Sequence, residues 1–102
     1  MEVGLNKIME QKQVQIKIGD NELKGVYANL MRVTHTKEEF VLDFANIISP
    51  EEGGIVTARV ITSPSHLKRI IKTLTENMKR YEEKFGKVEE TKGPETKIGF
   101  QP

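Results

Sequence analysis

The chain has 102 residues, of which 36% are apolar and 30% charged, and its 16 basic and 15 acidic side chains give a net charge of +1. This length and apolar fraction suit one small domain with a single core. The near balance of charge excludes a histone-like protein that coats polyanions through bulk positive charge. The absence of cysteine excludes disulfides, thiolate catalysis and cysteine-ligated zinc.

No apolar run approaches the ~18 residues of a membrane span, and the first residues lack the apolar stretch of a signal peptide. We therefore expect a cytoplasmic protein with no membrane contact. The hydrophobic pattern predicts a polar N-terminal segment over residues 1–13, a single α+β domain over residues 14–86 and a polar C-terminal tail over residues 87–102.

Four segments have the composition and pattern of β-strands. They span residues 14–18, 26–34, 39–48 and 55–62. A short polar connection at 35–38 and a turn-rich loop at 49–54 indicate hairpins between consecutive strands. The sequence therefore predicts a four-stranded antiparallel β-meander.

Beyond residue 62 the apolar period changes to steps of three and four, which is typical of a helix. Ser63 before Pro64 is a typical helix start, and Gly86 is placed as a C-terminal cap. About 22 helical residues at ~1.5 Å each give roughly 33 Å, enough to lie along the whole sheet. We therefore expect an α+β fold in which one long C-terminal helix packs on one face of the sheet. The periodic positions are Leu67, Ile70, Ile71, Leu74, Met78, Tyr81 and Phe85.

The predicted sheet has two apolar faces but only one helix to cover them. The face with Met31, Phe40, Leu42 and Phe44 is the richer in large side chains, so we assign the helix to it. An uncovered second face would expose several hundred Å² of apolar surface, which stable monomers rarely tolerate. We therefore predict a homo-oligomer, a two-fold dimer first, with a monomer whose tails cover that face as the alternative. The second face carries Leu30, Val41, Ile47, Ile55 and Ile61.

Arg32, Asp43 and Arg59 are the charged residues on this second face. The loop lengths favour registers in which Asp43 lies between the two arginines, although a slip of one residue would separate them. Two interpretations stay open. The triad is either an ion-pair cluster that fixes the strand register or a subunit interface, or an anion site made by two arginines.

The start of the predicted helix carries charge of the unfavourable sign for a helix N-terminus. His66, Lys68 and Arg69 place positive charge where acidic residues are preferred by about 0.3–1 kcal/mol each. Together with free backbone N–H groups they could hold a phosphate; alternatively they are solvated, or pair with the loop acids Glu51 and Glu52. The candidate anion-binding residues are Arg32, Arg59, His66, Lys68 and Arg69.

Catalytic and metal-binding patterns are missing from the sequence. The two histidines, His35 and His66, lie at no spacing typical of metal ligands. Ser63 and Ser65 share one helical turn with His66, which does not suit a nucleophile and its base. We expect no enzymatic activity, no metal and no cofactor.

The strings EFVLDF at 39–44 and SPSHLKR at 63–69 resemble a family of small bacterial and archaeal proteins known only as a domain of unknown function. The resemblance covers about residues 27–86 and implies a prokaryotic source and a meander-plus-helix domain, but no activity. The order of elements is also similar to part of the export chaperone SecB, an oligomer that binds unfolded chains. The motif positions are Asn29, His35, Asp43, Arg59, His66, Lys68 and Arg69.

These observations favour a non-enzymatic, oligomeric interaction protein whose apolar sheet face or helix groove contacts protein, either a second copy or a partner. The alternative is a protein that binds nucleic acid or a phosphate ligand through the basic cluster at the start of the helix.

Overall fold

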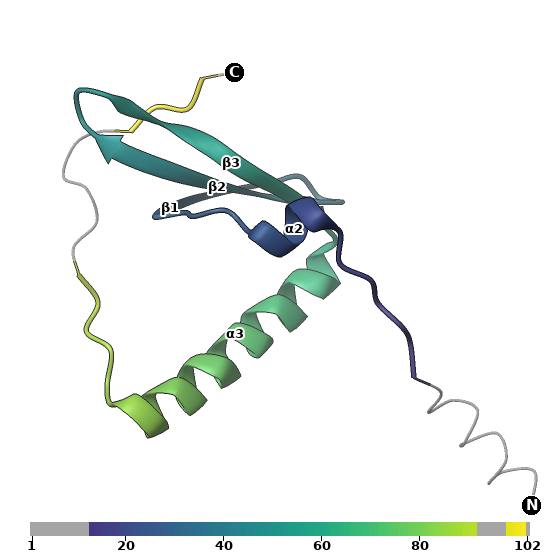
Figure 1. The fold of residues 1–102 in the computed structure, drawn as a ribbon. Coiled ribbons are helices and arrows are strands. Elements are labelled where there is room, and N and C mark those ends of the chain that lie inside the picture. The colour runs from purple at the N-terminus through teal and green to yellow at the C-terminus, as the bar shows by residue number, and fades with distance from the viewer. Residues whose placement is uncertain (1–12, 92–97, 102) are drawn as a thin grey trace, which may run out of the picture.

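The computed structural model describes residues 13–91 and 98–101. The predicted segment 1–13 lies outside these residues except for Gln13, as do positions 92–97 and 102 of the predicted tail. Figure 1 shows a sheet with one long helix on one side of it. In chain order the elements are α2 (Asp20–Lys24), β1 (Leu30–His35), β2 (Phe40–Ser49), β3 (Gly53–Thr62) and α3 (Pro64–Phe85).

The three strands form an antiparallel sheet in the order β1-β2-β3. In the first hairpin the hydroxyl of Thr36 accepts hydrogen bonds from the N–H groups of Glu38 and Glu39, both at 3.2 Å. In the second, the hydroxyl of Ser49 accepts from the N–H of Glu52 at 3.1 Å, and Gly53 adopts a φ of 75° that favours glycine. Both turns lie in the connections that the sequence indicated.

The prediction of a fourth strand at residues 14–18 was wrong. Val14, Ile16 and Ile18 are 78%, 88% and 62% exposed, and Figure 1 shows their segment running away from the sheet. An alternating pattern yields a strand only where a neighbouring strand accepts its backbone hydrogen bonds. Here α2 follows directly, and β1 begins at Leu30 rather than at residue 26.

The pairing defines two faces of the sheet. Arg32, Asp43 and Arg59 are register partners across the three strands, and Leu30 is the partner of Ala45 on the same side. We call this side the triad face. The opposite side, the leucine face, is defined by Met31, Val33, Leu42, Phe44 and Val60.

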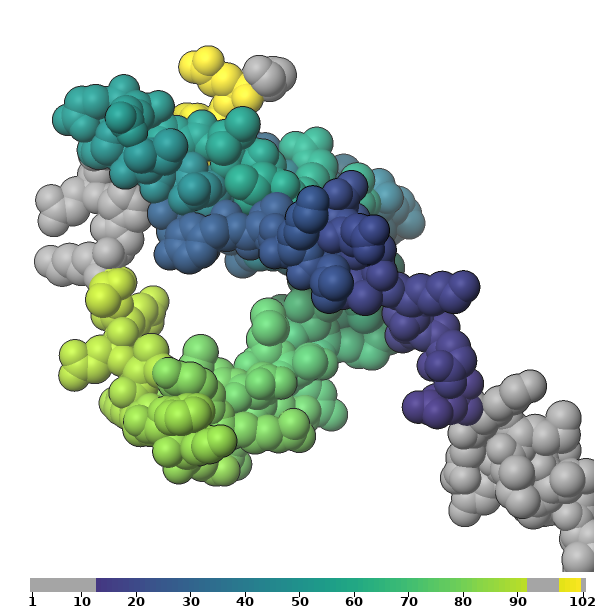
Figure 2. Space-filling model, viewed as in Figure 1, coloured from purple at the N-terminus to yellow at the C-terminus, as the bar shows by residue number. Residues whose placement is uncertain are grey.

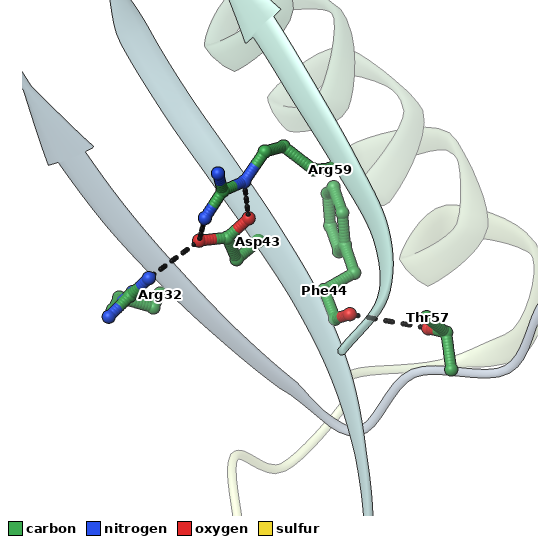
Figure 3. A network of polar contacts seen from close by, with 5 residues as sticks. All are labelled: Arg32, Asp43, Phe44, Thr57 and Arg59. Carbon is green, nitrogen blue, oxygen red and sulfur yellow. Dashed lines mark hydrogen bonds and ion pairs between the residues drawn. The ribbon is translucent and has the colours of Figure 1, made fainter. Parts of the chain in front are cut away.

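A β-bulge in β3 changes the predicted alternation. Phe44 pairs with Ala58 and Ala45 with Val56, so Thr57 is the extra residue. The bulge moves Val56 opposite Ala45, whereas strict alternation had placed Ile55 on the triad face. The Thr57 hydroxyl donates to the carbonyl of Phe44 at 3.2 Å, which holds the bulge in place (Figure 3).

The helix α3 has the predicted ends. The Ser63 side chain accepts from the N–H of His66 at 3.2 Å, Pro64 is the first helical residue, and Gly86 follows the last with a φ of 98°. The N–H of Gly86 donates to the carbonyl of Glu82 at 2.9 Å.

The prediction that this helix packs on the sheet was wrong for a single copy. The helix leaves β3 through Ser63 and diverges from the leucine face, and Figure 2 shows a hollow between sheet and helix. No strand forms a packed interface with α3 in the part of the chain that the structure describes. Leu74 and Phe85 remain 63% and 65% exposed.

The core of the described residues is correspondingly small. Among them only Leu42 and Ala45 are buried apolar residues, and the other side chain enclosed to this degree is the carboxylate of Asp43. A domain of this size ordinarily buries well over half of the surface that its unfolded chain exposes. The described fold instead leaves many large apolar side chains exposed, among them Ile55, Leu74 and Phe85.

Candidate functional site

The triad in the middle of the sheet is the most specific polar arrangement in the described structure (Figure 3). Arg59 binds Asp43 through two bonds, from Nε to Oδ1 at 2.6 Å and from Nη2 to Oδ2 at 3.0 Å. Arg32 approaches from β1 and donates from Nη2 to Oδ2 at 2.8 Å. The predicted register is therefore present, and one carboxylate holds both outer strands to β2.

The three charged side chains of the triad differ in their exposure to solvent. The Asp43 side chain is fully buried, whereas those of Arg32 and Arg59 are 35% and 57% exposed. Hydrogen bonds from Arg59 and then Arg32, opposed by desolvation, lower the pKa of Asp43 from 3.8 to about 2. The same bond raises the pKa of Arg59. Both arginines thus donate hydrogen bonds to one carboxylate of the same chain. This supports the interpretation of the triad as an ion-pair cluster that fixes the strand register, rather than as an open anion site.

The pKa shift gives a pH prediction. Because the folded pKa lies below that of a free aspartate, the stabilisation by ionised Asp43 is complete above the unfolded pKa and is lost as pH falls through the folded value. We expect the unfolding temperatures of the natural chain and of Asp43→Asn to differ by a constant amount above about pH 5 and to converge between about pH 4 and pH 2. Thermal unfolding by circular dichroism checks this, and a difference that widens on acidification would contradict it.

Asn29 is a structural residue whose role sequence reasoning missed. Its side-chain amide donates to the carbonyl of Ile47 at 2.9 Å and accepts from the N–H of Ile47 at 2.8 Å. The amide thereby imitates a strand residue and continues the β1–β2 pairing beyond Leu30. The position of Asn29 among the motif residues was the available signal, but nothing in the local pattern indicated a backbone partner 18 residues away.

The helix-start residues form a separate group. Arg69 donates from Nε to Nδ1 of His66 at 3.3 Å, so this imidazole nitrogen is an acceptor. No hydrogen bond or ion pair among the described residues joins Lys68 or Arg69 to Glu51 or Glu52. The loop acids follow β2 at one end of β3, whereas the helix begins beyond the other end. This arrangement does not support the alternative in which Lys68 and Arg69 pair with these acids.

The five candidate anion-binding residues do not form one group, since Arg69 contacts His66 at the start of α3 but neither contacts Arg32 or Arg59. Arg32 and Arg59 belong to the triad face, and Figure 3 shows α3 behind the sheet when that face is in front. Within the described residues no His, Cys, Asp and Glu side chains gather into a group that could hold a metal ion. His35 instead stacks against its register partner Phe40, with ring centroids 5.1 Å apart.

The C-terminal residues lie on the triad face. The ring of Phe100 stacks on the Arg32 guanidinium with 4.2 Å between the ring centroid and Cζ. Ile98, Gly99, Phe100 and Gln101 form one wall of a groove floored by the sheet. Residues 98–101 thus cover part of this face.

Among the helices of the described residues, none has the length and apolar character needed to cross a membrane.

A comparison with protein-family models matches residues 2–90 to a family described as "Protein of unknown function (DUF3467)". A search of curated proteins found no match. A search of solved structures also found none, so the similarity to SecB stays a prediction. The match covers most of the chain and confirms the expectation of a family of unknown function. The chain belongs to the DUF3467 family.

Proposed function

We propose that this protein is a non-enzymatic interaction domain that acts as a homodimer, with α3 and the leucine face of each copy as the contact surface. The observation that carries the proposal is the exposure of the apolar stripe of a 22-residue helix: Ile71, Leu74, Met78 and Tyr81 are 56%, 63%, 49% and 50% exposed. In proteins an amphipathic helix gains most of its stability from packing its apolar face against another surface.

The charges of α3 favour a second copy as the occupant. Its first two turns carry Lys68 and Arg69 and no acid, whereas its last turns carry Glu82 and Glu83 together with Lys79, Arg80 and Lys84. An antiparallel pair places the acid-free start of each helix beside the end of the other that contains acids, whereas a parallel pair would bring the two acid-free starts together. A two-fold axis produces this arrangement, because the same patch is then used on both copies.

The helix alone offers too little contact area for a stable dimer, so the sheet must contribute to the interface. A helix stripe of roughly 33 Å by 10 Å offers much less than the ~800 Å² per partner of a typical stable interface. The leucine face adds apolar side chains on the same side, since Met31, Val33 and Val60 are 50%, 43% and 45% exposed. We propose that the helix of one copy enters the hollow between sheet and helix of the other (Figure 2).

Light scattering after size exclusion, at low and moderate salt, tests the proposal. We expect a mass of twice the 11.6 kDa of the chain under both conditions, because burial of apolar surface is screened by salt far less than ion pairs are. A monomer at concentrations of about 100 µM, well above the Kd of most stable dimers, would contradict the proposal.

The alternative function, binding of nucleic acid or phosphate, has less support. It rests on His66, Lys68 and Arg69 at the start of α3 alone, because Arg32 and Arg59 are bound to Asp43 on the triad face.

A further inference from the structure

The groove on the triad face is a second surface, on the side of the sheet away from the proposed dimer contact. It has a volume of about 630 Å³ and a mostly apolar lining, within the size range of sites that hold ligands. The C-terminal residues fill only part of the space above the sheet. The floor is formed by Leu30, Ala45, Ile47 and Val56, and the wall by Ile98 and Phe100.

Arg32 provides the specific contact with the wall. Its guanidinium is held by the buried carboxylate of Asp43, and its Cζ lies over the ring of Phe100. The Nε of Arg32 is buried and has no hydrogen-bond partner among the described residues. An aromatic ring over the guanidinium suits this position, because the negative face of the ring attracts the cation and requires no further hydrogen bond.

The tail contributes two apolar side chains to the groove. Residues 98–101 all line it, and Ile98 and Phe100, two positions apart, supply the apolar side chains. A Cβ added to Gly99 would meet no atom within 4 Å, so there is space for a side chain at the position between Ile98 and Phe100.

We infer that the triad face is a peptide-binding groove for extended segments with an aliphatic and an aromatic side chain two positions apart, and that the chain's own C-terminal residues 98–101 occupy it in cis. The aromatic ring stacks on Arg32, and the aliphatic side chain contacts the apolar floor. The inference does not depend on the proposed dimer, which uses the opposite face.

The absence of tryptophan from the chain allows a direct test. Phe100→Trp in the full chain introduces a single indole over Arg32, and Ile16→Trp introduces one at a position that is 88% exposed. We expect acrylamide to quench the indole of Phe100→Trp less than that of Ile16→Trp, to the same extent at low and high protein concentration. Equal quenching would overturn the docked tail, and protection that grows with concentration would overturn docking in cis.

Two further comparisons isolate the contact. In the Phe100→Trp chain, Arg32→Lys is expected to shift the ratio of docked to free tail about two- to fivefold toward the free state, the effect of losing an exposed cation–π contact. The matched control Arg59→Lys removes the planar group that binds Asp43 from the other side and should leave quenching unchanged. Equal effects of the two would show that the triad, rather than the ring contact, holds the tail.

Competition tests the sequence pattern. An excess of the peptide KIGFQP is expected to displace the tail and raise quenching, whereas KIGAQP should not. Displacement by both peptides, or by neither, would overturn the inferred pattern. Far-ultraviolet circular dichroism of each variant confirms that it is folded.

Discussion

Asp43→Ala is expected to lower the thermal unfolding temperature by about 10 °C, the scale on which a small domain responds to the loss of a hydrogen-bonded charge. The carboxylate is the shared acceptor of Arg32 and Arg59 and is fully buried between them. Its removal leaves two cations facing each other across β2 and a vacant volume below them. It also removes the side-chain link between β2 and both neighbouring strands.

Two control variants distinguish the loss of the Asp43 charge from the loss of its side-chain volume, and from the removal of an exposed acid. Asp43→Asn keeps the shape and one acceptor oxygen, so its unfolding temperature should lie between those of the natural chain and the alanine variant. Glu51→Ala removes an acid from the exposed β2–β3 turn and should change the unfolding temperature little. An unaltered unfolding temperature for Asp43→Ala, measured by calorimetry, would show that the triad does not stabilise the sheet.

The double substitution Leu74→Gln with Met78→Gln is expected to convert the proposed dimer to a monomer. Each change removes an apolar side chain worth about 1.5–3 kcal/mol when fully buried, and both positions occur in each copy. Even with partial burial the Kd should rise by at least about two orders of magnitude. Light scattering over a dilution series measures the change.

The matched control is Lys72→Gln with Glu76→Gln. These residues lie four apart on the polar side of the same helix, and their joint replacement leaves the net charge unchanged. This control should keep the dimer mass. Dissociation of both variants would indicate that glutamine weakens the helix itself, and dissociation of neither would exclude the apolar stripe as the interface.

Local patterns predicted the elements that depend on local chemistry. The start of α3 at Ser63 and Pro64 and its end at Gly86 follow from capping, which neighbouring residues determine. The triad could be predicted because two short hairpin connections fix the register of Asp43 against both arginines. The extra residue Thr57 lies beyond the triad, and so leaves that register intact while altering the alternation nearer the turn.

The errors concern contacts between distant parts of the chain. Residues 14–18 have a strand pattern, but the pattern carries no information about whether a sheet edge is available to them. The apolar period of α3 correctly indicated an amphipathic helix, yet it could not specify whether the sheet of the same copy covers its apolar face. Asn29 and Phe100 each act on residues far away in sequence, at Ile47 and Arg32, and periodicity does not detect single long-range contacts of this kind.

The sharing of one carboxylate has a consequence for how the sheet forms. A slip of one residue in either hairpin would turn Asp43 away from one arginine and leave a buried carboxylate half satisfied. Each hairpin therefore stabilises the correct register of the other, although β1 and β3 do not pair directly. This coupling through β2 makes the assembly of the two hairpins cooperative, because β1 and β3 each stabilise the register that the other adopts on β2.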